Sequence, residues 1–487
     1  MSMFRSYLKA QAFHEGRAQP SATVRHVHLS HAPLVFVPLR MAGEAAAPLG
    51  AMVGCDRAAP TLLVVPQPRN RELRFAFATE LAAVVLPYIE RFAGETETVE
   101  AKTPYERCLD APQILVPNPR GVAFSRLLGR STRFRRTSGP YAVPPSVPAF
   151  GQWLTFLAER AEHAGSSMFL AMTDVLAAHW VTGQSGVEDG TLAALLAWIA
   201  PPAGSTGHEA AAESEDPTRT PPAGPDTDPE FDRKVLQPAI DAYDASGSPE
   251  RVEEALRRHL QPTWDLMWRA VDLLRGLPEA AGVSGRWERD RTALAREVAR
   301  LGENPTPQGR WDSPVAAARR LAALEIAQQT YEAARAFDDP LAMAEYRVEG
   351  AAFAGEVVAV EADRRIVPPG GKRAVPRPLV TVRTGDPVRL APGTRVFSPA
   401  RRTQRKAEIV SVAGDTVTIQ INDGMGQGRE PAPGSVPSLG EVVCYTDLDP
   451  GGGRTPPLPA LSDTPWTHGG PPEPYVPTDE DAQESWS

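Results

Sequence analysis

The most restrictive feature of the sequence is a change of hydrophobic period near residue 354. Beyond it, apolar and polar residues alternate in six short runs, 355–363, 378–384, 394–399, 407–412, 415–422 and 440–448. Gly, Pro and Asp separate these runs, and Ala413-Gly414-Asp415 is a tight hairpin signal between the fourth and the fifth. Strands this short, in under a hundred residues, usually close on themselves. We therefore predict a small antiparallel β-barrel over residues 354–448.

The N-terminal part of the chain mixes strand-like and helical patterns. Short β-branched or apolar runs lie at 23–30, 33–40, 50–56, 61–67 and 112–118. Apolar residues at helical spacing follow or separate them at 71–92, 149–164, 167–180 and 191–200. This order predicts an α/β domain over residues 1–145, with a helical extension over residues 146–202.

A Pro-rich, acidic segment follows the helical extension. Residues 201–231 contain few apolar side chains, which cannot offset the entropy cost of ordering a packed core. We therefore predict a disordered linker over residues 203–231 and place the main domain boundary there. Helical patterns at 251–260, 264–277, 286–301 and 312–337 then predict a helical stalk over residues 232–353.

The fold class predicted from these segments is α+β and multidomain. The tail, residues 449–487, is rich in Pro and Gly and ends acidic, so we expect it to be disordered. No stretch reaches the roughly 18 apolar residues of a membrane span, and no apolar leader is visible at the N-terminus. We therefore predict a cytoplasmic protein. Its three cysteines are far apart in sequence, and we predict no metal or cofactor.

The charge of the chain is unevenly distributed. Residues 364–406 contain twelve cationic side chains and one acid, Asp386, a net charge of +11 in a chain of net charge −9. A phosphate backbone is the natural counterpart of such a field, and ten of the twelve cations are Arg, which suits bidentate phosphate contacts. Our first-choice phosphate contacts are Arg401, Arg402, Arg405 and Lys406, followed by Arg373, Arg377 and Arg383. The alternative interpretation is a solvated basic face.

A second basic run lies in the N-terminal part. It supplies four further candidate nucleic-acid contacts, Arg130, Arg133, Arg135 and Arg136. Phe124 and Phe134 lie among the arginines of this run, which also includes Arg120 and Arg126, as in a groove that follows a strand and stacks its bases. The alternative is that the two phenylalanines belong to the core and the arginines surround it.

The order of helical stalk and basic barrel resembles an insertion found in superfamily 1 helicases of the nonsense-mediated-decay and DNA-replication type. The resemblance covers residues 312–448 and is carried by PLVTVRTGDPVRL, with Gly385 and Asp386 after an apolar strand, and by the alternation of DTVTIQIND. It implies that the barrel grips nucleic acid or modulates a motor.

The motor itself has no counterpart in the sequence. A helicase needs a G-x-x-x-x-G-K-[ST] loop to cradle phosphates, and here the Gly-Lys pair, Gly371-Lys372, is followed by Arg373 in place of the hydroxyl. We therefore predict that the chain is not an ATPase. The resemblance then implies a separately encoded helicase or ATPase as partner.

Two alternatives to a non-catalytic nucleic-acid-binding accessory protein stay open. A metal-dependent nuclease, intact or degenerate, would use Glu44 and Asp56 in the N-terminal domain, where Gln67 and Arg69 replace the usual acid and lysine. A scaffold would instead offer the arginines to an acidic protein partner. His26, His28 and His31 have a spacing seen in some metal sites, although surface or boundary histidines are the commoner explanation.

Overall fold

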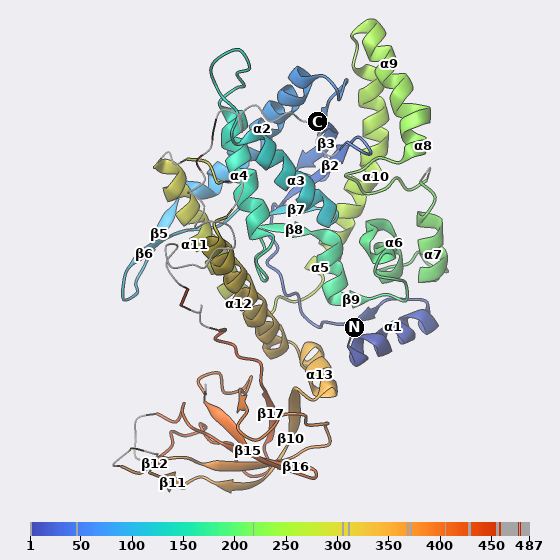
Figure 1. Ribbon diagram of the computed structural model, residues 1–487. Coiled ribbons are helices and arrows are strands. Elements are labelled where there is room, and N and C mark those ends of the chain that lie inside the picture. The colour runs from blue at the N-terminus through green and yellow to red at the C-terminus, as the bar shows by residue number, and fades with distance from the viewer. Residues whose placement is uncertain are drawn as a thin grey trace, which may run out of the picture. The chain divides into compact units, whose positions relative to one another are not determined.

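The computed structural model (Figure 1) describes residues 2–44, 47–217, 219–303, 306–309, 312–367, 370, 373–404, 406–426, 430–453, 457–458, 476 and 478. They divide into two compact units. We call the first the α/β unit, which contains Lys9–Pro20 and Arg25–Leu324. The second, the barrel unit, contains the described parts of Met1–Leu8, Ser21–Val24 and Glu325–Thr455. The predicted domain boundary at 203–231 is therefore wrong, because the chain stays within one unit there.

A five-stranded sheet forms the centre of the α/β unit, in the order β4-β3-β2-β7-β8. Its strands are β2 (Leu34–Arg40), β3 (Pro48–Gly54), β4 (Thr61–Val64), β7 (Ile114–Val116) and β8 (Phe169–Ala171). The first three pair antiparallel, whereas β7 lies parallel to both β2 and β8. Nearly all of β2 is buried, as expected for a strand with both faces covered.

Helices cover both faces of this sheet (Figure 1). Leu34 and Phe36 of β2 pack into a core that includes α2 (Arg71–Ala93), α3 (Pro119–Thr132), α4 (Ser146–Arg160) and α11 (Val283–Gly302). Val35, Val37 and Leu39 point the other way, because successive side chains alternate along a strand. That second core includes α5 (Met172–His179), α6 (Leu192–Ile199), α9 (Gln237–Ser246) and α10 (Glu250–Arg275).

Local sequence signals explain where several of these helices begin. Asn70 and Asn118 are the N-caps of α2 and α3, and each side chain accepts two backbone N–H groups of the first turn. The smaller elements of this unit are β1 (Gln19–Pro20), β5 (Thr96–Val99), β6 (Tyr105–Cys108), β9 (Trp180–Val181), a 3-10 turn (Glu188–Gly190), α8 (Pro229–Phe231) and a π-helical turn (Asp232–Leu236). Helix α1 (Met3–Glu15) precedes them in the chain.

Two local predictions in the N-terminal part are wrong. Residues 23–30 do not form a strand and instead make an isolated bridge at Arg25. Here the backbone N–H of His26 donates to Nε2 of His179 at 3.0 Å, so a side chain replaces a strand partner. The predicted helix at 167–180 begins as strand β8, because Phe169 to Ala171 pair with β7 before α5 starts at Met172.

The predicted disordered linker is also wrong in this structure. Within it, Gly207–Ser214 form helix α7, which begins with a capping box between Thr206 and Glu209. Ala211 is 7% exposed and belongs to the second core, and Gly207 lies so close to the Trp198 ring that an added Cβ would clash with it. The small residues that made this segment look unable to form a core are what allows it to pack tightly on α6.

The predicted stalk does not begin at residue 232. The helical patterns at 251–260 and 264–277 belong to one helix, α10, which continues through Pro262 and packs on β2, β3 and β4. Trp264, Met267 and Val271 of α10 are fully buried in the second core. These residues therefore complete the α/β unit. Helices α12 (Pro314–Asp338) and α13 (Pro340–Glu349) precede the barrel strands.

The predicted antiparallel β-barrel is confirmed in part, because the barrel unit contains a nearly closed, six-stranded antiparallel sheet. Each of the six predicted runs contains a strand, namely β10 (Ala352–Glu361), β13 (Leu379–Arg383), β14 (Arg395–Val396), β15 (Ala407–Ala413), β16 (Thr416–Gln420) and β17 (Val442–Thr446). Their order is β14-β15-β16-β13-β10-β17, and an antiparallel bridge between Phe397 and Thr446 connects the two ends. Gly414, with φ of 61°, and Asp415 form the tight β15–β16 turn.

Two further predictions concern the C-terminal tail and the absence of a membrane span. Most of the tail predicted at 449–487 lies outside the described residues. Within the described part of the chain, no helix has the length and apolarity that crossing a membrane requires.

Candidate functional site

A two-stranded hairpin between β10 and β13 collects the arginines of the first half of the basic window. We call residues 364–377 the arm. Its strands are β11 (Arg365–Ile366) and β12 (Val375–Pro376), which pair antiparallel (Figure 1). The sequence of the arm contains no acid and five cations, Arg364, Arg365, Lys372, Arg373 and Arg377, of which Lys372 lies outside the described residues. Glu361 and Asp363, at the end of β10, are the nearest acids in sequence.

The base of the arm is held by hydrogen bonds to neutral oxygens. Nη1 of Arg364 donates to the carbonyl of Arg377 at 2.9 Å and to Oε1 of Gln420 at 2.8 Å. The backbone N–H of Arg377 donates to the carbonyl of Arg364 at 2.8 Å. Nη2 of Arg365 donates to the carbonyl of Ala374, at an exposed position. Because carbonyl and amide acceptors carry no net charge, these bonds orient Arg364 without cancelling its charge.

The segment from Ser398 to Lys406, which holds our first-choice contacts, is arranged differently. Nη2 of Arg401 contacts both carboxylate oxygens of Glu441, at 2.7 and 2.9 Å, and the Arg401 side chain is only 12% exposed. Partial burial acts to raise the pKa of Glu441, but the Ser438 N–H and the Arg401 guanidinium outweigh it and lower that pKa. Arg401 is therefore an internal partner of β17 rather than an exposed phosphate contact.

Two of the other first-choice residues, Arg402 and Lys406, also contact acids from outside the basic window. Nη2 of Arg402 contacts Oδ1 of Asp338 at 3.0 Å, although the Arg402 side chain is 53% exposed. The backbone N–H of Lys406 donates to Asp423, and its side chain is exposed. Arg405 lies outside the described residues. The positive charge that is segregated in the sequence is thus partly balanced in the fold.

Two more barrel arginines face acids across the sheet. Arg383 lies 3.7 Å from a carboxylate oxygen of Asp415, with both side chains mostly exposed. Arg395 is the cross-strand partner of Glu408. Opposite charges at such positions attract one another weakly in water. Arg373, in the arm, is exposed, and no carboxylate of the described residues lies within ion-pair distance of it.

The second basic run does not form the expected stacking groove. Phe124 and Phe134 are 2% and 8% exposed, so they belong to the core. Arg133 and Arg135 are 4% and 7% exposed, and their Nε atoms donate to the carbonyls of Gln308 and Ser131. Buried arginines of this kind hold the fold together and cannot reach a phosphate in this conformation. The remaining two positions of the run, the half-buried Arg130 and the exposed Arg136, lie at and beyond the end of α3.

The residues of the nuclease alternative lie in separate contacts. Arg69 pairs with Glu44 at 3.6 Å, Gln67 donates to Asp244, and Asp56 accepts the N–H of Ala58 in a turn. Among the histidines, His26 is fully buried and His28 stacks on Trp287 with ring centroids 4.0 Å apart. No group of three or more His, Cys, Asp or Glu within the described ranges is placed to hold a metal ion.

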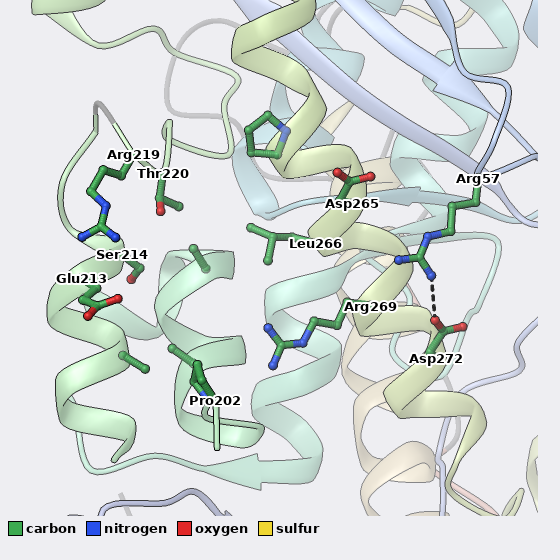
Figure 2. Close-up of a pocket in the computed structure, with 14 residues that line it drawn as sticks. Arg57, Pro202, Glu213, Ser214, Arg219, Thr220, Asp265, Leu266, Arg269 and Asp272 are labelled. Carbon is green, nitrogen blue, oxygen red and sulfur yellow. Dashed lines mark hydrogen bonds and ion pairs between the residues drawn. The ribbon is translucent and has the colours of Figure 1, made fainter. Parts of the chain in front are cut away.

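Sequence reasoning missed a cavity in the α/β unit. It lies between α7 and α10 (Figure 2). Its volume is about 510 Å³. Arg269 and Asp265 of α10 line one side, and Glu213 and Arg219 line the other. Arg57 is paired with Asp272 at 3.1 Å at the edge of the cavity. The signal that could have revealed it is the spacing Thr206-x-x-Glu209, a capping box that predicts α7.

Comparison of the chain with protein-family models, with curated proteins and with solved structures finds no match.

Proposed function

We propose that the barrel unit binds nucleic acid through the arm, residues 364–377. The observation that supports this proposal is the grouping of four described arginines and no acid on one hairpin, with the hydrogen bonds of Arg364 and Arg377 made to uncharged oxygens. A cluster of this kind attracts a polyanion, because each phosphate that it neutralises releases a condensed counterion. The arm takes the place of Arg401 and its neighbours as the first-choice contact.

The mode of contact that we propose is backbone binding rather than base reading. Arg365 and Arg373 are exposed on the arm, and the planar guanidinium group suits phosphate oxygens. Next to the arm, the outward side of the sheet carries Thr381, Thr418 and Gln420, whose polar groups can accept or donate hydrogen bonds along a strand of nucleic acid. Such contacts position a nucleic acid without specifying its sequence.

A salt titration tests this proposal. The full chain is titrated with short mixed-sequence probes of single-stranded DNA, duplex DNA, single-stranded RNA and duplex RNA, and binding is followed by fluorescence anisotropy. We expect at least one probe to bind with an affinity that falls as salt increases, with a slope of about −0.9 per phosphate contact on duplex DNA. If none of the four probes binds at low salt, the proposal is wrong.

The partner that we propose is a separately encoded helicase or ATPase, as the resemblance of residues 312–448 implies. A chain that holds nucleic acid but lacks a phosphate-cradling loop needs such a motor to couple binding to movement. Co-purification from the source cells, repeated after nuclease treatment, tests this. An ATPase retained after the treatment supports direct partnership, whereas an acidic protein without ATPase motifs would instead support the scaffold alternative.

A further inference from the structure

The polar cavity of Figure 2 adjoins a second, more apolar cavity. The second has a volume of about 350 Å³, and both are lined by Arg219 and Pro262. The apolar lining comes from Phe231, Val235, Ala255, Pro217 and Pro221. Volumes of this order are those of sites for small organic molecules. The two cavities together therefore offer an apolar compartment beside a charged one, with Arg219 where they meet.

A buried histidine lines the apolar cavity. His259 of α10 is 4% exposed, and its ring lies 4.2 Å from that of Phe231, measured between centroids. Its Nε2 is buried and has no hydrogen-bond partner among the residues that the structure describes. Burial lowers the pKa of His259 to about 4, so the ring is neutral at physiological pH. The unpartnered nitrogen of a neutral imidazole can form one hydrogen bond with a polar group on a ligand.

The charged groups around the apolar cavity differ in how far they are already paired. Lys234 is paired with Glu230, and Arg258 contacts Glu254 at 2.6 Å on its own helix. Asp228 accepts two backbone N–H groups as the N-cap of α8. Among the described residues, no carboxylate lies within ion-pair distance of the Arg219 side chain, which lines both cavities. Among the described residues of the apolar cavity, Arg219 is therefore the cation available to a ligand, and Arg269 of the adjoining polar cavity, which donates to the carbonyl of Ala200, is a second.

We propose that these adjoining cavities bind a small aromatic anion, with its ring packed beside the Phe231–His259 pair in the apolar cavity and its carboxylate or phosphate on Arg219. The ring would fill the apolar compartment, and a hydroxyl or ring nitrogen would reach His259. This site is separate from the arm and does not depend on nucleic-acid binding by the barrel unit.

Binding of two probes to the full chain tests the site. AMP represents aromatic phosphates, and 4-hydroxyphenylacetate represents aromatic carboxylates. Adenosine and phenol are the same rings without the anion, while inorganic phosphate and acetate are the anions without the ring. We expect AMP or 4-hydroxyphenylacetate to bind, as measured by calorimetry, and the four partial probes to bind at least about tenfold more weakly. Which of the two binds identifies the anion.

Two matched variants locate the binding. Arg219→Gln should lower the affinity for the probe at least about tenfold. Arg258 lines the same cavity but already has a partner, so Arg258→Gln should change that affinity less than about threefold. The NMR resonances of the His259 imidazole should shift when the probe binds to the wild-type chain, a readout that needs no substitution at position 259. Failure of both probes to bind, or equal binding by Arg219→Gln, would overturn the proposal. So would equal binding of phosphate or acetate alone, which would identify an adventitious ion only.

Discussion

In the arm, the guanidinium of Arg364 donates to a backbone carbonyl and an amide oxygen, whereas in the 398–406 segment that of Arg401 contacts both carboxylate oxygens of Glu441. Both regions lie in the same basic window of the sequence. What separates them is the neighbour that the fold supplies, since Glu441, the residue before β17, lies beside Arg401, while no acid of the sequence lies within the arm. The comparison teaches that a run of arginines describes a binding surface only after its partners in space are known.

The largest effect that we expect from this comparison concerns the arm. The double variant Arg365→Glu/Arg373→Glu should weaken nucleic-acid binding at least about tenfold and flatten its salt dependence, because it removes two cations from the proposed contact surface. Anisotropy titrations at several salt concentrations measure both quantities.

The matched control reverses two barrel arginines that face acids. Arg383→Glu/Arg395→Glu makes the same change in net charge, but we expect an affinity within about threefold of the wild type. Equal losses in the two double variants would show that the net charge of the unit matters rather than the arm, and would contradict the comparison.

A second effect concerns stability rather than binding. Arg401→Gln should lower the free energy of unfolding of the barrel unit by about 1–2 kcal/mol, because it leaves a partly buried Glu441 carboxylate without its guanidinium partner. Denaturant unfolding followed by circular dichroism measures this change. Arg373→Gln is the control and should leave the unfolding midpoint unchanged. If Arg401→Gln weakens nucleic-acid binding while stability stays constant, Arg401 is a contact after all.

The same pair predicts how the barrel unit responds to acid. The pKa of Glu441 is lowered in the folded state, so its stabilising effect is complete above the ordinary value of about 4.3. It is lost as the pH falls through that value toward the folded-state pKa. We expect the wild-type barrel to lose stability in this range more steeply than Arg401→Gln, as unfolding curves at successive pH values would show. Identical slopes for the two chains would show that the pair does not shift the Glu441 pKa.

The smallest effect is expected for an exposed pair. Arg383→Gln should change the free energy of unfolding by less than about 1 kcal/mol, because Arg383 and Asp415 are 3.7 Å apart and largely solvent-exposed. Thermal unfolding of the variant beside the wild type is sufficient to measure it. A larger loss would mean that Arg383 belongs to the structural group of arginines with Arg401.

The sequence predicted the barrel well, because its strands alternate with a period of two and Gly414-Asp415 is a strong turn signal. The same approach failed for α7, where low hydrophobicity suggested disorder although small residues such as Gly207 and Ala211 pack closely on α6. It also divided α10 and assigned it to a stalk, since an amphipathic period does not say which surface the apolar side covers.

The candidate site could be predicted only in part, for the same reason. Charge density identified the basic window, and the arm lies within it. The order in which its arginines were expected to contact phosphate was misleading, because first-choice Arg401 is paired with Glu441, which lies 40 residues away in the sequence. For Phe134 and Arg133 the sequence left a stacking groove and a core position both open; both residues are buried, and Arg133 donates to the carbonyl of Gln308. Long-range contacts of this kind leave no local pattern in a single sequence.

Site-specific photo-crosslinking tests the central claim most directly. A photoreactive phenylalanine analogue replaces either Val367, in the arm, or Leu439, next to the Arg401–Glu441 pair, both of which are exposed. The two chains are irradiated with the probe that binds in the salt titration. We predict a crosslink to nucleic acid from position 367 and little or none from position 439. A crosslink from position 439 without one from position 367 would contradict the assignment of nucleic-acid binding to the arm.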